Sequence, residues 1–352
     1  MRFASDNWAG ASPKVIDALA HAARDGGPAY GGDSITKAVE RQFSELFERD
    51  VAVFLVASGT IANALAVSAY TRPGGVVLCH GEAHLHTEEA GATEFFGAGL
   101  KTIPIEGAAG KIAPETLAQA LARHPERLLH QGQPVAVSIT QITEFGAAYR
   151  PAEIAAIAEV ARSRDCVLHM DGARFANAVA ALKVRPAEVT WRAGVDVLSF
   201  GCTKNGCIAA EAVVFFNPAH ARDVGFARQR AGQGFSKNWF LAAQLAAYLD
   251  GDHWLELARN ANAMATRLAS AIDQSADARL AAKPDGNEVF VILSKDADRR
   301  LKAAGAVYHP WTVDALPPDQ RPGKEEGLFR LVASWRTSAA EVDRFAQCLR
   351  GR

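Results

Sequence analysis

The alternation of short apolar runs with longer helical patterns is the feature that most restricts the fold of this chain. Strands that alternate with helices favour a mainly parallel sheet covered by helices on both faces. We therefore predict a large α/β domain. The runs typical of strands are 51–56, 76–79, 100–105, 135–139, 167–170, 195–200 and 212–216, and helical patterns at 61–70, 114–123 and 151–163 lie between several of them.

The pattern changes after about residue 240. A largely helical stretch is followed by two further strand-like runs and a last helix, at 240–272, 289–293, 329–332 and 339–350. This order predicts a smaller α+β domain at the C-terminus. We place the division so that residues 1–245 form an N-terminal arm and the large domain, and residues 246–352 form the small domain. The first 45 residues are expected to be rich in turns and to drape over the main domain or a neighbouring subunit.

Composition excludes several classes of function. The formal net charge is −1, with 38 basic and 39 acidic side chains, so no excess of basic residues is available for a nucleic acid or a membrane surface. The five cysteines have neither CxxC nor metal-finger spacing, and their odd number fits a reducing compartment better than a disulfide framework. The start has no signal-peptide pattern, and no run of about 18 apolar residues occurs. We expect a cytoplasmic protein that acts on a small molecule.

Three polar groups follow predicted strands. Ser58-Gly59-Thr60 comes after the first strand and opens a helix. Asp171 ends the fifth strand, and Lys204 follows the sixth in a turn of glycines and small residues, which suggests the close approach of a ligand. Because the carboxyl ends of parallel strands meet at one edge of a sheet, we expect these groups to share a site. Taken singly, they are also typical of a helix cap, a strand-to-loop cap and a surface charge.

Together these groups match the requirements of one cofactor, pyridoxal phosphate (PLP). PLP needs a lysine that forms an imine with its aldehyde, an acid that keeps the pyridine nitrogen protonated, an anion site for the phosphate and a group packed on its ring. Lys204 is the candidate lysine, and Asp171 can pair with the pyridine nitrogen. The positive end of the helix after Ser58 suits a phosphate. The sequence therefore predicts a PLP enzyme.

The chain resembles the low-specificity L-threonine aldolases and the related L-phenylserine aldolases, which are fold-type I PLP enzymes. The resemblance extends along essentially the whole chain and implies the architecture of aspartate aminotransferase. In that architecture a large α/β domain with a mainly parallel seven-stranded sheet carries a small C-terminal α+β domain. The segments that carry the resemblance are Ser5-Asp6-Asn7, Tyr30-Gly31-Gly32-Asp33, and the stretches 57–63, 168–174 and 199–206.

The resemblance also implies roles for individual residues. The segment 58–60 would hold the PLP phosphate, and Asp171 would pair with the pyridine nitrogen. Arg174 would lie beside the phenolic oxygen of PLP and the substrate carboxylate; a structural ion pair with a neighbouring acid is the alternative. Ser5 would reach the substrate carboxylate from the N-terminal arm.

Arg330 is expected to bind the substrate carboxylate from the small domain. It lies in the predicted strand 329–332. A guanidinium suits this task because it holds a carboxylate through two parallel hydrogen bonds. Arg336 is the rival candidate.

A histidine and a glutamate complete the predicted site. The family places a histidine over the PLP ring, five residues before a Glu-Ala/Gly-Gly segment, and counting back from Glu89 selects His84 rather than His80 or His86. Three histidines in seven residues could also hold a metal, but we predict no metal site. The family often carries a second active-site histidine after a strand. Glu144 stands there instead, so the acceptor of the substrate hydroxyl proton is left open between His84, Glu144 and a bound water.

The reaction that the resemblance implies is the cleavage of L-threonine, L-allo-threonine or a related L-β-hydroxy-α-amino acid, phenylserine included, to glycine and an aldehyde. One alternative is another PLP lyase or transferase reaction on the same fold, such as β-elimination or glycine hydroxymethyl transfer. The other is a PLP-fold binding or regulatory protein without turnover, against which the intact Lys204 and Asp171 argue. The resemblance further implies a homotetramer, or a homodimer with sites at the subunit interface.

Overall fold

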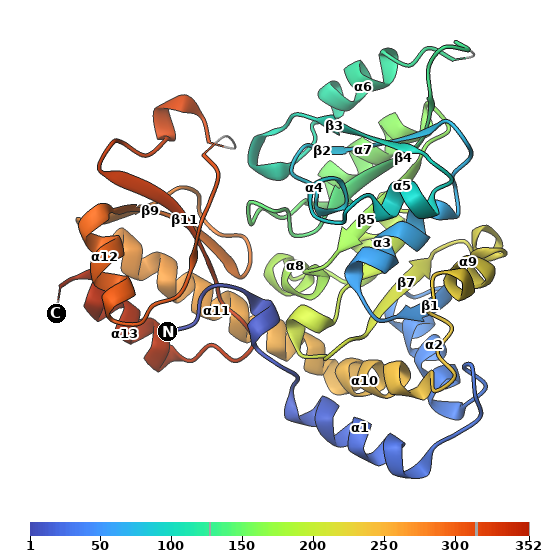
Figure 1. Ribbon diagram of the computed structural model, residues 1–352, viewed down its shortest axis with the longest axis horizontal. Coiled ribbons are helices and arrows are strands. Elements are labelled where there is room, and N and C mark those ends of the chain that lie inside the picture. Colours follow the sequence, from blue (N-terminus) through green and yellow to red (C-terminus); the bar gives the residue numbers. More distant parts are fainter. Residues whose placement is uncertain (127, 314–315, 352) are drawn as a thin grey trace.

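A seven-stranded sheet forms the centre of the larger part of the molecule in the computed structural model, which describes residues 1–126, 128–313 and 316–351 (Figure 1). Its strands lie in the order β1-β7-β6-β5-β4-β2-β3, and β7 runs antiparallel to both of its neighbours while the other pairs are parallel. The predicted sheet is thereby confirmed. The strands are β1 (Ala52–Val56), β2 (Gly75–His80), β3 (Lys101–Ile105), β4 (Gln133–Thr140), β5 (Val167–Gly172), β6 (Val197–Phe200) and β7 (Glu211–Phe215).

Both faces of the inner strands of this sheet are buried, which explains why these strands are rich in continuous apolar runs rather than alternating ones. On β7, Ala212 and Val214 belong to one core cluster, whereas Val213 and Phe215 belong to the cluster on the opposite face. The covering helices are α2 (Ser34–Leu46), α6 (Pro114–Ala122), α7 (Pro151–Arg162), α8 (Phe175–Leu182) and α10 (Trp239–Leu249) with the first cluster, and α3 (Gly59–Ser68), α5 (Ala92–Phe96) and α9 (Val224–Arg230) with the second. The short helix α4 (His84–Thr87) follows β2.

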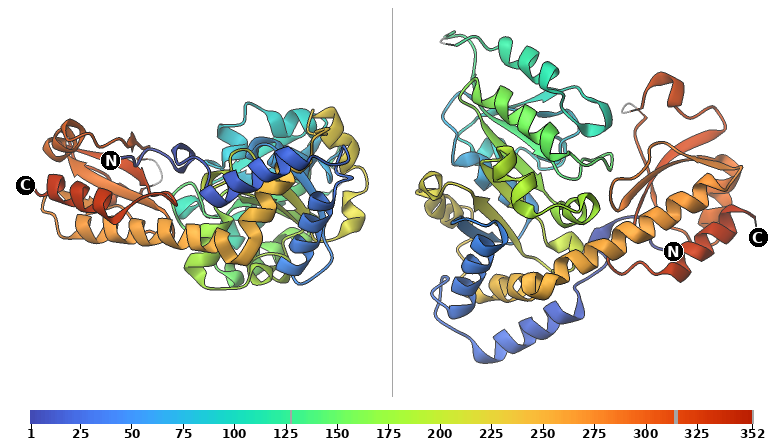
Figure 2. Two further views of the ribbon diagram at one scale, coloured as in Figure 1. Left: turned by 90° about the horizontal axis from the view of Figure 1, so that it is seen from below. Right: turned by 180° about the vertical axis from the view of Figure 1, so that it is seen from behind.

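A second, four-stranded antiparallel sheet of order β10-β11-β9-β8 forms the C-terminal part. Its core contains side chains of three helices, and this arrangement confirms the predicted α+β unit. The long helix α11 extends from this sheet toward α10 and links the two parts (Figure 2). The elements are β8 (Ala278–Leu280), β9 (Glu288–Ser294), β10 (His309–Pro310), β11 (Glu326–Val332), α11 (His253–Asp273), α12 (Lys295–Ala303) and α13 (Ala339–Leu349).

The N-terminal segment corrects one prediction. Instead of turns, it forms α1 (Pro13–Asp25) and α2, both of which pack against α10. Each helix begins with a side-chain cap: Ser12 Oγ accepts from Val15 N, and Asp33 accepts from Thr36 N.

The first residues belong to the small part of the molecule. Phe3 N donates to Val307 O at 2.8 Å, Val332 N donates to Phe3 O at 2.8 Å, and the Phe3 ring lies edge-on to Phe345. The chain therefore starts beside the small sheet and crosses to the large part before α1. Within the described ranges, no helix has both the length and the apolar character that a membrane span would require.

Candidate active site

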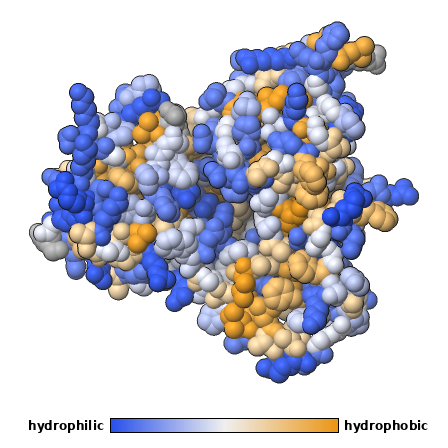
Figure 3. Space-filling model, in the orientation of Figure 1, coloured by the Kyte–Doolittle hydropathy of each residue, from blue (hydrophilic) through white to orange (hydrophobic). Residues whose placement is uncertain are grey.

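A cavity of about 570 Å³ lies between the two parts of the molecule. Figure 3 shows the surface hollowed in this region, between the lobe that carries the small sheet and the lobe that carries the large one. The structure brings all ten predicted site residues to its wall. They are Ser5, Ser58, Gly59, Thr60, His84, Glu144, Asp171, Arg174, Lys204 and Arg330.

The turn after β1 presents the start of α3 to the cavity. Ser58 is the N-cap of this helix, and its Oγ accepts a long hydrogen bond of 3.5 Å from Ile61 N. A Cβ placed on Gly59 would meet nothing within 4 Å, so the helix end faces open space. The free N–H groups and positive end of the helix dipole make this place suitable for an anion.

Two glycines let the backbone after Asp171 and the backbone before Lys204 approach each other. A Cβ on Gly172 would lie 2.7 Å from Ser199 O, and a Cβ on Gly201 would lie 2.6 Å from Ala173 O. Both distances are too short for any other residue. Glycine at 201 is therefore required by contact between two backbone segments, where the sequence had suggested contact with a ligand.

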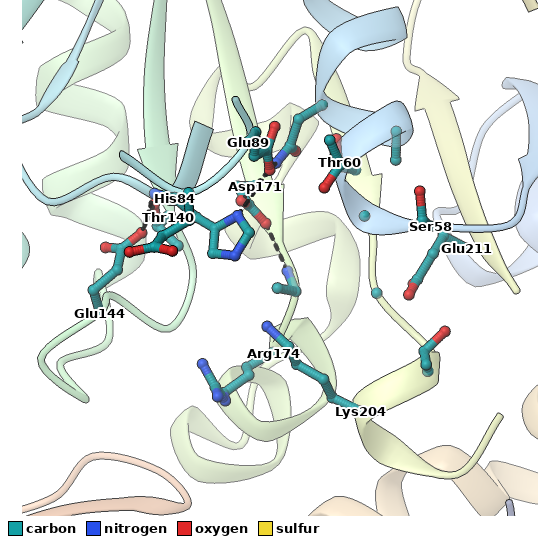
Figure 4. A pocket seen from close by; sticks show the side chains of 18 of the residues that line it. Ser58, Thr60, His84, Glu89, Thr140, Glu144, Asp171, Arg174, Lys204 and Glu211 are labelled. Atoms are coloured by element: carbon teal, nitrogen blue, oxygen red, sulfur yellow. Dashed lines mark hydrogen bonds and ion pairs between the residues drawn. The ribbon is translucent and has the colours of Figure 1, made fainter. Parts of the chain in front are cut away.

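Asp171 is buried and receives hydrogen bonds from neutral donors. Its Oδ2 accepts from Asn63 Nδ2 at 2.8 Å and its Oδ1 accepts from Ala173 N at 2.9 Å. Lys204 lies in a short 3-10 turn (Thr203–Asn205), and its amine has no hydrogen-bond or ion-pair partner among the described residues. The amine and the carboxylate both face the cavity (Figure 4).

The turn around Lys204 is held on both sides. Asn205 Nδ2 donates to Tyr248 Oη at 2.7 Å and to Trp254 O at 2.8 Å. On the other side, Glu211 Oε2 accepts from Cys202 N at 2.6 Å, and burial raises the pKa of Glu211 to about 7. These contacts fix the backbone from which the lysine side chain extends.

His84 is the histidine that reaches the cavity. Its Nδ1 lies 2.9 Å from Glu89 Oε1, and this hydrogen bond raises the pKa of His84. The neighbouring histidines have other partners: His80 Nε2 contacts Gly107 O at 3.1 Å, and His86 Nδ1 contacts Thr102 Oγ1 at 2.8 Å. In the part of the chain that the structure describes, no group of three or more His, Cys, Asp or Glu side chains could hold a metal ion.

Glu144 lies just beyond the end of β4, next to His84. Its Oε1 accepts from His84 N and from Thr140 Oγ1, both at 3.0 Å. Its Oε2 is buried and has no partner among the described residues. Burial raises the pKa of Glu144 to about 7, so this carboxyl can change its protonation state near neutral pH.

Two arginines with acidic partners also line the cavity. Arg174 Nε and Nη2 contact the two oxygens of Asp6 at 2.8 and 3.1 Å, and Arg174 Nη1 lies 3.2 Å from Glu288 Oε2. Glu288 Oε1 is 3.6 Å from Arg330 Nη1, and the Arg330 guanidinium lies 4.1 Å from the centroid of the Trp311 ring. Burial opposes the charged form of Arg174, but the attraction of Asp6 and Glu288 outweighs it and raises the pKa of Arg174.

Arg336, the rival candidate for the substrate carboxylate, does not line the cavity. Its Nη1 is 3.4 Å from Ala9 O. Burial lowers the pKa of Arg330, although Glu288 partly offsets this effect. Of the two rivals, Arg330 is the one whose side chain faces the cavity.

Sequence reasoning missed five polar residues around the site, namely Asp6, Asn63, Glu89, Glu211 and Glu288. Asp6, Asn63 and Glu89 stood inside or beside segments already singled out, but no role was given to them. Glu288 carried the clearest signal, because a buried acid at the start of an apolar strand needs a partner. Which residue would be that partner was not readable from the sequence.

Comparison with known proteins places the chain in a family. Residues 2–296 match the family model described as beta-eliminating lyase. The chain is 38% identical over 349 residues to the low specificity L-threonine aldolase of Pseudomonas aeruginosa. The aligned region covers 99% of this chain and 97% of that protein. It is also similar to the solved threonine aldolase of Leishmania major, at a TM-score of 0.90 and 26% identity over 99% of this chain and 98% of that one.

More distant structures share the fold alone. One is a serine palmitoyltransferase solved with PLP, at a TM-score of 0.70 and 14% identity over 100% of this chain and 86% of that one. The relationship is much closer to the aldolases, since identity and coverage are both high along the whole length. The chain belongs to the beta-eliminating lyase family and, within it, to the low-specificity L-threonine aldolases.

Proposed function

We propose that this protein is a PLP-dependent aldehyde-lyase that cleaves L-threonine, L-allo-threonine and related L-β-hydroxy-α-amino acids, phenylserine included, to glycine and an aldehyde. One observation carries the proposal. A lysine amine without a partner among the described residues, a buried carboxylate and a helix N-terminus line the same cavity as two arginines. The full-length similarity to a protein named as an L-threonine aldolase supports it.

The residues present fit PLP. Lys204 supplies an amine without a protein partner among the described residues, and Asp171 supplies a carboxylate whose protein bonds come only from neutral donors. The open end of α3 at Gly59 supplies N–H donors for a phosphate. A volume of about 570 Å³ lies within the range usual for cofactor and substrate pockets. We propose that Ser58, Gly59 and Thr60 bind the phosphate and that Asp171 holds a proton on the pyridine nitrogen.

The protein's own residues orient the substrate. When bound, PLP supplies a ring that accepts the electron pair of the broken Cα–Cβ bond. We propose that Arg330, Arg174 and Ser5 bind the α-carboxylate, because guanidinium groups hold carboxylates in a defined geometry. Holding the carboxylate fixes the orientation of the bond that breaks. His84 is proposed to pack on the cofactor ring.

Glu144 is proposed as the acceptor of the β-hydroxyl proton. Its Oε2 has no protein partner among the described residues, although it is buried at the cavity wall. The other oxygen is held by His84 N and Thr140 Oγ1, which fixes the direction of the carboxyl group. A base with a pKa near the working pH is suited to proton transfer. His84 and a bound water remain the competing acceptors.

Turnover with a panel of substrates tests the proposal. Purified protein supplied with PLP should release glycine and the matching aldehyde from L-threonine, L-allo-threonine and phenylserine, whereas Lys204→Ala should lose activity and the absorption of the lysine-bound cofactor. Borohydride reduction should attach the cofactor to Lys204. Labelling of another lysine, or elimination to a keto acid instead of aldehyde release, would overturn the proposal. The homotetrameric assembly and the cytoplasmic location stay predictions.

A further inference from the structure

Asn63 and Glu89 form a hydrogen-bonded bridge between Asp171 and His84. Asn63 lies on α3, and its Nδ2 donates to Asp171 Oδ2 at 2.8 Å and to Glu89 Oε1 at 2.9 Å. An amide nitrogen carries two hydrogens, so both are used. The same Glu89 oxygen lies 2.9 Å from His84 Nδ1. Four side chains from three segments are thus joined along the cavity wall: Asp171 on β5, Asn63 on α3, and His84 and Glu89 in the stretch around α4.

The bridge is buried except at its histidine end. Asn63 is 2% exposed and Glu89 and Asp171 are each 4% exposed, whereas 45% of the His84 side chain is exposed. Both donors meet the same oxygen of Glu89, while its Oε2 is buried without a partner among the described residues. The carboxylate is therefore turned toward His84 although a polar atom is left unsatisfied, an arrangement that simple packing does not require.

The bridge also decides which imidazole nitrogen faces the cavity. An ionised carboxylate can only accept, so Nδ1 of His84 must donate to Glu89. Nε2 has no partner among the described residues, and the ring reaches into the cavity near Asp171 and Lys204 (Figure 4).

We propose that Glu89 and Asn63 are positioning residues of the active site: Glu89 holds the His84 ring through Nδ1 and leaves Nε2 for the cavity, and Asn63 ties Glu89 to Asp171. This inference rests on the proposed function for its catalytic meaning, but its geometry concerns the protein alone. A carboxylate that orients an imidazole in this way fixes both its tautomer and its plane.

The charges around His84 predict the direction in which its pKa should change in each variant. The hydrogen bond to Glu89 has the largest effect and raises the pKa of His84; burial lowers it, the nearby Asp171 raises it and Lys204 lowers it. Glu144 also faces this residue, through its hydrogen bond to the His84 backbone. Loss of the Glu89 charge should therefore lower the pKa of His84. Loss of Asn63 should raise it, because both carboxylates then lose a donor that stabilises their charge.

The test is the pH dependence of His84 modification by diethyl pyrocarbonate, which reacts with neutral imidazole, followed by peptide mass spectrometry on the protein with its cofactor. Glu89→Gln should lower the midpoint of the modification profile by about one pH unit, and Glu89→Asp should stay near wild type. Asn63→Leu should raise the midpoint. The modification rate of the exposed His309 serves as the internal standard, and Glu115→Gln on the surface of α6 is the matched control.

Opposite shifts of the His84 midpoint in Glu89→Gln and Asn63→Leu distinguish a positioning role from a general loosening of the site. A mutation that merely loosened the site would move His84 toward ordinary solution behaviour in both variants, so a lowered midpoint in Asn63→Leu would overturn the proposal. An unchanged midpoint in Glu89→Gln would also overturn it. If Glu89→Gln does not fold, Asn63→Leu alone still decides by its sign. Failure of the aldolase proposal is distinguishable, since it would appear as absent turnover in the wild-type protein with these midpoint shifts intact.

Discussion

The two walls of the cavity differ in whether their charged side chains have oppositely charged protein partners. On the large-sheet wall, Asp171 and Lys204 have no oppositely charged protein partner within 4 Å among the described residues. On the wall that adjoins the small domain (the small-domain wall), Arg174 from the loop after β5 is already paired with Asp6 and Glu288, and Arg330 on β11 lies near Glu288. Charges on the first wall are left for a ligand, whereas charges on the second are shared between a ligand and the protein. Loss of a charge should therefore reduce activity more on the first wall than a change of charge geometry does on the second.

Asp171→Asn should have the largest effect of the substitutions considered for this comparison. The change keeps the shape of the side chain but removes a charge that no other group replaces, so kcat should fall roughly 10²-fold or more. The measurement is turnover at saturating PLP. Asp196→Asn is the matched control, because Asp196 binds Leu168 N at 2.8 Å at the opposite edge of the sheet and should affect stability only. Near-wild-type turnover of Asp171→Asn with PLP bound would contradict the role.

Glu144→Gln tests a buried carboxyl at the same wall. Burial raises the pKa of Glu144 to about 7, so the group is protonated and unable to accept a proton below that pH. Activity should therefore rise as the pH increases through about 7, and the variant should lose this limb together with roughly 10²-fold in kcat. The pH–rate profile is the measurement, with Glu159→Gln on the exposed face of α7 as control. A limb that persists unchanged in Glu144→Gln would assign it to another group, His84 foremost.

Arg330→Lys tests a change of charge geometry on the small-domain wall. The change keeps the charge but loses the paired geometry of the guanidinium, and a charge-assisted hydrogen bond contributes about 1.5–3 kcal/mol. We expect kcat/KM to fall roughly 10- to 150-fold for all substrates alike, since each about 1.4 kcal/mol is a factor of ten. The PLP spectrum should not change. If Arg336→Lys were the damaging substitution and Arg330→Lys the mild one, the carboxylate site would have been assigned to the wrong arginine.

Ser58→Ala should have the smallest effect and separates a phosphate ligand from a helix cap. Loss of an N-cap alone costs about 1 kcal/mol of stability, and loss of a phosphate contact should in addition weaken PLP binding several-fold. Titration of the apoprotein with PLP and thermal unfolding measure the two effects separately. Ser294→Ala removes the cap of α12, far from the cavity, and should change stability alone. Equal PLP affinity in both variants would show that Ser58 acts only as a helix cap and does not bind the phosphate.

The difference between the walls also explains which parts of the site could be predicted. Ser58, Asp171 and Lys204 each follow a strand of the large sheet, and parallel strands bring their carboxyl ends to one edge whatever the loops do. The strand pattern and the order of these residues were enough to place them together. The expected division after residue 245 is untested and stays a prediction; α10 spans it, from Trp239 to Leu249.

The second wall was not predictable in the same way. Asp6, Arg174 and Glu288 come from the N-terminal arm, the loop after β5 and the start of β9, and no periodicity links positions so far apart. Their meeting depends on Phe3 being anchored beside the small sheet, which carries Ser5 and Asp6 across the cavity.

What the sequence by itself determined is the alternating architecture, the family and the set of groups at the strand ends. These follow from local hydrophobic patterns and from motifs that are contiguous in the chain. Only the tertiary structure decided which polar partners accompany those groups: Glu89 beside His84, Asn63 between two carboxylates, and Glu288 between two arginines. The physical reason is that a buried charge must find a partner, but burial fixes only that need. Which residue meets it depends on long-range packing of segments that local patterns do not encode.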